Sequence, residues 1–136
     1  MKIEQLTPSL LEIVGLGQKT SFALLRGFLD GRGFADGMRT AFGSSIDVEA
    51  ASAFINDIVS GRESLRVSIL ENNQLNGAYG AFDQITGTIF LSKDFLLANS
   101  ADPSKISAVL LEEFGHLLDS KFNLTDALGD EGAIFS

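Results

Sequence analysis

The residues best suited to chemistry lie in the stretch Glu112-Glu113-Phe114-Gly115-His116, which contains the only histidine of the 136 residues. We predict that this stretch is helical. In a helix, Glu112 and His116 are four positions apart and therefore share one face, one turn from each other. Glu113 lies about 100° further round the same helix. A carboxylate and an imidazole in this relation are common metal ligands, and the second carboxylate can act as a general base.

The spacing matches that of the H-E-x-x-H zinc helix. In that helix, residues at i and i+4 hold the metal, and the glutamate after the first ligand activates water. This chain keeps the glutamate base at Glu113, the glycine at Gly115 and the last ligand at His116, but Glu112 replaces the first histidine. The motif therefore predicts a metal site with a changed first ligand.

An ordinary solvated helix face is the alternative interpretation. That face would consist of Lys105, Glu112, His116 and Asp119. Two features favour a functional site instead. Gly115 in mid-helix costs about 1 kcal/mol relative to alanine, although helix crowding would also explain it. Glu113 lies close to the apolar side, where a carboxylate is expensive without a partner such as a metal or a polar network.

The segments before this helix add a resemblance. A glycine-rich turn and a short strand, Asn76-Gly77-Ala78-Tyr79-Gly80-Ala81-Phe82-Asp83, are followed by Thr86-Gly87-Thr88-Ile89-Phe90-Leu91-Ser92 and then by the helix. The order resembles that of zincin metallopeptidases, in which an edge strand comes just before the active-site helix. It is similar to the zincin-like domains of large secreted bacterial proteins, including cyanobacterial ones. The resemblance covers residues 65–136.

The resemblance implies a third metal ligand. Phe122 stands six residues after His116, where the metzincin pattern has a histidine, so that subclass is excluded. The gluzincin pattern uses a glutamate on a following helix, and Glu131 in Asp130-Glu131-Gly132 is the candidate. An acid that favours a helix dipole is the alternative interpretation of Glu131. Asp119 and Asp126 are weaker substitutes.

The implied site has Glu112, His116 and Glu131 as metal ligands and Glu113 as the catalytic base. Two carboxylates and one imidazole bind zinc less selectively than two histidines do, so manganese or iron are alternatives to zinc. The extra negative charge makes a metal-bound water less acidic. We therefore expect proteolytic activity to be weak or absent. A degenerate site without metal is the remaining alternative.

Other chemistries fit less well. Ser120 lies one turn from His116, but no nucleophile elbow or oxyanion hole accompanies it. Glu112 and Glu113 point apart, so they cannot flank a glycosidic bond. Asp30-Gly31-Arg32-Gly33 lacks the lysine and hydroxyl residue of a phosphate-binding loop, and no EF-hand loop is present.

The composition limits the partners. The net charge of −8 disfavours nucleic acid and anionic membranes, and the absence of cysteine excludes disulfides and thiolate sites. No apolar run reaches the roughly 20 residues of a membrane span. The N-terminus has no signal-peptide pattern, so the resemblance suggests export by a route without such a signal. The ending after Ile134-Phe135-Ser136 suggests a fragment or a natural continuation.

The order of the predicted helices and strands indicates an α+β fold. We expect a single domain, residues 1–136, with a helical N-terminal part at 1–64 and the zincin-like part at 65–136. A first helix should end at Gly15 and Gly17, and others should cover 21–30 and 47–59, with mainly loop over 31–45. A small, mainly antiparallel sheet follows. The last helix begins at Asp102-Pro103 and is capped by Asn123.

Three functions follow. The first is a metallopeptidase-like domain that binds a peptide along its edge strand, predicted at 88–91 from Thr88 to Leu91. The second is a non-catalytic pseudo-peptidase that serves as a binding module of a secreted protein. The third is a helical homo-oligomerisation domain, because the N-terminal helices carry more apolar surface than a small sheet covers.

Overall fold

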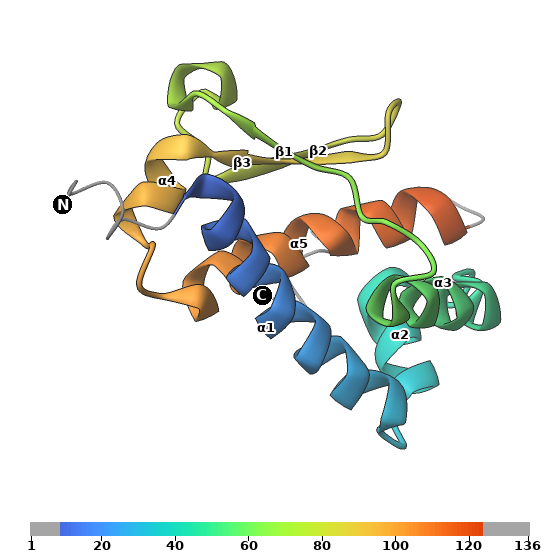
Figure 1. The fold of residues 1–136 in the computed structure, drawn as a ribbon. Helices are drawn as coiled ribbons and strands as arrows, with labels where there is room; N and C mark the ends of the chain where they lie inside the picture. Colours follow the sequence, from blue (N-terminus) through green and yellow to red (C-terminus); the bar gives the residue numbers. More distant parts are fainter. Residues whose placement is uncertain (1–8, 124–136) are drawn as a thin grey trace, which may run out of the picture.

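The computed structural model describes residues 9–123, which form helices and one three-stranded sheet (Figure 1). The elements in chain order are α1 (Leu10–Asp30), α2 (Phe34–Phe42), α3 (Val48–Ser60), β1 (Val67–Leu70), the 3-10 helix η2 (Asn72–Leu75), β2 (Gly80–Asp83), β3 (Thr88–Ser92), α4 (Lys93–Ala98) and α5 (Pro103–Phe122). The predicted α+β class is confirmed.

Helix α1 is one continuous helix of 21 residues. It begins with a capping box in which the Ser9 side chain accepts from the Glu12 N–H and the Glu12 side chain accepts from the Ser9 N–H. The prediction that a helix ends at Gly15 and Gly17 is wrong. Each glycine costs about 1 kcal/mol in a helix, but burial of the apolar side of α1 on both sides of them outweighs that cost.

Helices α2 and α3 complete the N-terminal part. The side chain of Asp47 accepts from the Ala50 N–H and starts α3, which ends at Gly61 in the left-handed region with φ +84°. Both ends follow the prediction. Helix α2 replaces most of a segment predicted as loop, because Met38 and Phe42 are buried on its inner side.

The sheet is mixed rather than mainly antiparallel. Its strand order is β1-β3-β2. Strand β1 is parallel to β3, with Val67 opposite Ile89. Strand β2 is antiparallel to β3, with Phe82 also opposite Ile89.

Strand β3 is the central strand, so the prediction that 88–91 is an edge strand is wrong. The connection from β2 to β3 is short and turns back at Gly87, where φ is +68°. It therefore pairs β3 with β2, and β1 takes the other side of β3. The physical reason is burial: Ile89 and Leu91 are fully buried, and a strand paired on both sides lies where the core covers it best. Within residues 9–123, the edge strands are β1 and β2.

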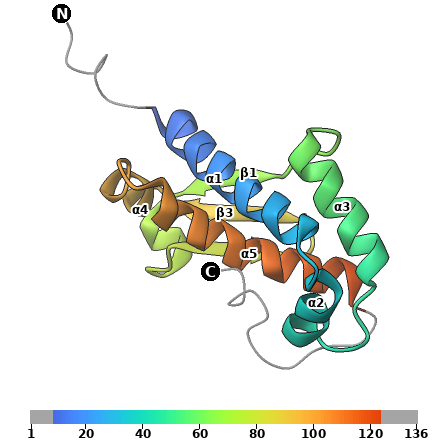
Figure 2. The ribbon, with the colours of Figure 1, turned by 90° about the horizontal axis from the view of Figure 1, so that it is seen from below.

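Helices α1 and α5 lie side by side against one face of the sheet (Figure 2). One hydrophobic core fills the space between the layers, and it joins residues of both parts of the chain, from Ile13 in α1 to Leu118 in α5. Helices α2 and α3 lie near the C-terminal end of α5. The sheet and α1 thus hold the helix that carries Glu113 and His116.

Candidate functional site

Helix α5 is held in place by its N-terminal cap and by its contact with α1. The Asp102 side chain accepts from the Lys105 N–H, and Pro103 occupies the first turn, as predicted. In the interface with α1, a Cβ atom added to Gly17 would lie 2.5 Å from Cγ2 of Ile106. Only glycine therefore permits this approach of the two helices.

A buried polar contact joins the same two helices. The hydroxyl groups of Ser21 and Ser107 are 2.8 Å apart, and the Ser21 hydroxyl also lies 2.9 Å from the carbonyl oxygen of Gly17. Both serines are buried. Because a buried hydroxyl is costly without a partner, this contact favours one register of α1 against α5.

Strand β2 lies close to the side of α5 that carries Glu113 and His116. A Cβ atom added to Gly80 would lie 2.8 Å from Val109 Cγ1 and 3.4 Å from Glu113 Cγ. The glycine at this position therefore allows strand and helix to approach. Phe82 is two residues further along β2 and lies on the same face of the sheet, since side chains alternate along a strand.

A cleft of about 450 Å³ opens between β2 and α5, and we call it the α5 cleft. Its lining residues are Phe82, Gln84, Glu113, His116, Asp119, Ser120 and Asn123. Glu113 is only 8% exposed, whereas His116 is half-buried. The structure thus brings the predicted base and the predicted histidine ligand into one cleft, beside Phe82 of β2 and Gln84, which directly follows β2.

The other predicted ligands are not gathered there. Glu112 is half-buried and does not line the α5 cleft. Glu131 and Asp126 lie outside the described residues. Among residues 9–123, no three histidine or acidic side chains are close enough together to hold a metal ion. In the described part of the chain, the α5 cleft therefore contains His116, a predicted ligand, and Glu113, the predicted base, and the metal site itself stays a prediction.

Asp119 is held in the α5 cleft by Asn123. The Asn123 Nδ2 donates to Oδ1 of Asp119 at 2.7 Å and to the carbonyl oxygen of Phe42 at 2.6 Å. The Ser45 hydroxyl donates to the Asn123 Oδ1 at 3.0 Å. The connection between α2 and α3 is therefore tied to the end of the site helix. Asn123 also caps α5, as predicted, through its backbone N–H to the carbonyl of Asp119.

Sequence reasoning missed three residues of the cleft lining, namely Phe82, Gln84 and the side chain of Asn123. A signal existed for the first two. Phe82 and Gln84 alternate with Ala81 and Asp83, so a strand beside the site helix turns one of these two sets toward it. No local pattern indicates that Asn123 contacts Phe42, because the two residues are brought together only by the tertiary fold.

The prediction of a solvated face fits only part of this helix. Lys105 is exposed, but Glu112, His116 and Asp119 are half-buried, and Glu113 and Gly115 are buried. A carboxylate as buried as that of Glu113 is costly unless polar contacts compensate for it. The side of α5 under β2 is therefore not an ordinary solvent-facing surface.

Comparison of the chain with family models, with curated proteins and with solved structures found no match. Within residues 9–123, no helix combines the length and the apolar character needed to cross a membrane.

Proposed function

We propose that this chain is a metallopeptidase-like domain with a modified metal site and weak or absent proteolytic activity. The observation that carries the proposal is the α5 cleft, in which the buried Glu113 and the half-buried His116 lie together under the edge strand β2. The resemblance of the motif to that of zincins motivates the assignment of roles.

His116 would hold the metal through its imidazole, with Glu112 and Glu131 as the proposed carboxylate ligands. Bound zinc, or manganese or iron in its place, would supply a Lewis acid that polarises a peptide carbonyl. Glu113 would accept a proton from the attacking water on its carboxylate. Glu112 is half-buried and does not line the cleft, which agrees with a weak metal site.

The geometry of β2 supports a peptide as the substrate. The N–H of Ser92 donates to the carbonyl oxygen of Tyr79 at 2.9 Å, so Tyr79 and Ser92 form a hydrogen-bonded pair. Such pairs alternate along antiparallel strands, and the peptide groups of Gly80 and Phe82 therefore point away from β3. Within residues 9–123, no strand pairs with that edge. An extended peptide added there would lie along the α5 cleft.

The test is hydrolysis of a mixture of unrelated peptides by the full chain, followed by mass spectrometry. Glu113→Gln should lower any measured rate by about 10²- to 10⁴-fold, the usual contribution of a general base. Glu49→Gln, at an exposed carboxylate of α3 outside the α5 cleft, is the matched control and should keep the rate. Equal hydrolysis by the native chain and Glu113→Gln would refute an enzymatic role.

A non-catalytic pseudo-peptidase is the second candidate, and the position of Glu112 outside the cleft lining favours it. Peptide binding without hydrolysis in the presence of zinc would support this candidate. Metal-dependent hydrolysis that a chelator abolishes would exclude it. The proposed homo-oligomer through the N-terminal helices stays a prediction, for which α1 offers the exposed Leu16 and Leu24.

A further inference from the structure

A second hollow continues the α5 cleft toward the turn between β2 and β3. It has a volume of about 370 Å³ and shares Phe82, Gln84 and Ser120 with the cleft. Two cationic residues, Arg66 and Lys121, also line it. We call it the Lys121 hollow. A peptide that follows β2 past Gln84 would enter this hollow next.

The Lys121 ammonium is held against an aromatic wall. Its Nζ lies 5.1 Å from the ring centroid of Phe54 and 6.0 Å from that of Phe122. The two rings are themselves 5.5 Å apart between centroids. A cation over aromatic faces keeps a defined position at a modest gain in stability. The positive charge of Lys121 is therefore held at the hollow.

Arg66 is also positioned, by a hydrogen bond from its guanidinium to the carbonyl oxygen of Thr86 at 3.2 Å. Neither Arg66 nor Lys121 forms an ion pair with a carboxylate of residues 9–123. Glu63, which lines the same hollow, reduces the net charge of its lining to +1. The chain has a net charge of −8, so this cationic hollow beside an acidic cleft is a local region of positive electrostatic potential.

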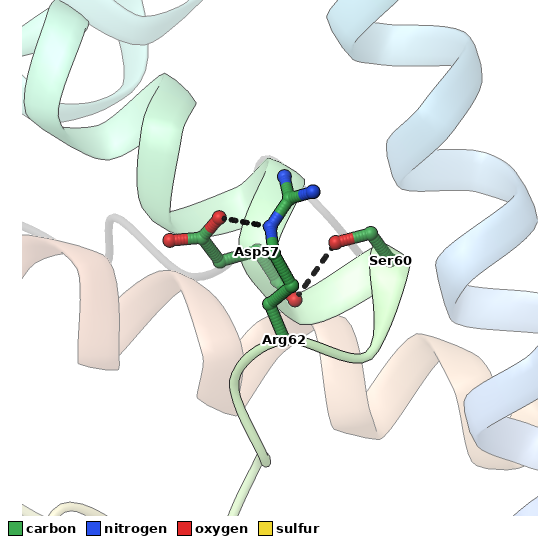
Figure 3. A network of polar contacts seen from close by, with 3 residues as sticks. All are labelled: Asp57, Ser60 and Arg62. Carbon is green, nitrogen blue, oxygen red and sulfur yellow. Dashed lines mark hydrogen bonds and ion pairs between the residues drawn. The ribbon is translucent and has the colours of Figure 1, made fainter.

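Arg62 provides a contrast within the same connection (Figure 3). Its Nε donates to Oδ1 of Asp57 at 3.0 Å, which neutralises its charge. The carbonyl oxygen of Asp57 accepts from the Ser60 hydroxyl at 3.3 Å and from the Glu63 N–H at 3.0 Å. These bonds shape the turn that leads from α3 toward Arg66. Arg62 does not line the hollow and is therefore a matched control.

We propose that the Lys121 hollow binds an acidic side chain of a peptide paired with β2. The inference rests on the proposed function, which places a peptide on that edge. A peptide antiparallel to β2 has its amino-terminal part toward Gln84. In this orientation, the acidic residue lies on the amino-terminal side of the residues over His116. Lys121 and Arg66 are specificity-determining residues, and neither touches the reacting atoms.

The experiment measures fluorescence anisotropy of labelled extended decapeptides with amidated C-termini, binding to the full chain with Glu113→Gln to prevent cleavage. One glutamate is scanned along the peptide, and glutamine at the same position is its reference. At low salt, the best-placed glutamate should tighten binding about two- to fivefold, as expected for partly exposed ion pairs. The preference should shrink at high salt, because added ions screen exposed charges.

The variants assign the preference to the hollow. Lys121→Gln and Arg66→Gln should each reduce it, and together they should abolish it. Lys121→Arg and the control Arg62→Gln should retain it. Circular dichroism on every variant checks that the fold is kept. A peptide with a free C-terminal carboxylate and no glutamate tests the other source of a carboxylate, and tighter binding of this peptide would overturn the assignment to a side chain.

Equal binding of glutamate and glutamine peptides, or no binding of either, would overturn the proposal. Loss of the preference in Arg62→Gln to the same extent as in Lys121→Gln would also overturn it, because the effect would then be a general one of net charge. Metal binding through His116 and hydrolysis through Glu113 are measured separately. Failure of the subsite and failure of the proposed function are therefore distinguishable.

Discussion

Two glycines of α1, two residues apart, should respond in opposite directions to the same substitution. Gly15 is exposed, and a Cβ atom added there would have no neighbour within 4 Å. Gly15→Ala should therefore stabilise the protein by about 0.5–1 kcal/mol, because alanine loses less backbone entropy in a helix. Gly17 is buried, and its added Cβ would lie 2.5 Å from Ile106 Cγ2.

That distance is about 1 Å shorter than an ordinary carbon–carbon contact. Overpacking of this kind costs about 1–3 kcal/mol, from which a gain of about 1 kcal/mol in helix propensity is subtracted. The overlap of about 1 Å puts the cost in the upper part of this range, about 2–3 kcal/mol, so we expect a net destabilisation of about 1–2 kcal/mol for Gly17→Ala. The two variants should differ by about 2 kcal/mol in free energy of unfolding, or about 1 M in urea midpoint.

The assay is urea unfolding followed by circular dichroism, with Ile106→Ala as a second background. Because Ile106→Ala removes Cγ2, Gly17→Ala should cost less in that background, and the coupling free energy should exceed about 0.5 kcal/mol. Shifts of the same sign in Gly15→Ala and Gly17→Ala, or no coupling to Ile106, would refute the packing of α1 against α5. The site helix would then be held in some other way.

Two further predictions concern the turn after β2 and the C-terminal end of α5. Hydrogen bonds from the Thr86 hydroxyl and the Ile85 N–H lower the pKa of Asp83 below its ordinary value of 3.8. These bonds therefore stabilise the turn above pH 3.8, and their contribution is lost as the pH falls through the lowered pKa. Thr86→Val should raise the pKa of Asp83 in an NMR titration, and an unchanged pKa would contradict the assignment. Asn123→Ala removes the donor to Phe42 and Asp119 and should destabilise the protein by about 1–3 kcal/mol in urea unfolding. An unchanged midpoint would mean that the connection between α2 and α3 does not depend on this side chain.

The class of the fold and most helix ends were predictable, because they depend on local chemistry. Asp47, Gly61, Asp102 and Asn123 act as caps through contacts within a few residues, and the sequence shows such contacts directly. Gly17 shows the limit of this reasoning. Locally it is a helix breaker, and its close contact with Ile106, far along the chain, explains why α1 has a glycine at this position.

The order of the strands was not predictable for a similar reason. Strand β3 is the most buried strand, but its residues are no more apolar than those of β1. Its central position depends on the parallel pairing of β1 with β3 across a long connection. In the site, the helical spacing puts Glu112 and His116 on one face, whereas Glu113 and His116 line the α5 cleft. It could not show that Glu112 lies outside the lining, since that depends on where β2 crosses the helix.

The most direct test of the proposed metal site is the metal content of the full chain, purified without a histidine tag, equilibrated with zinc and dialysed. Elemental analysis would compare the native chain with His116→Ala and with Ser120→Ala, a control that lines the α5 cleft without a proposed ligand role. We predict a stoichiometric amount of zinc in the native chain and in Ser120→Ala, and its loss in His116→Ala. Absence of metal from the native chain, or equal metal in His116→Ala, would contradict a metal site at His116.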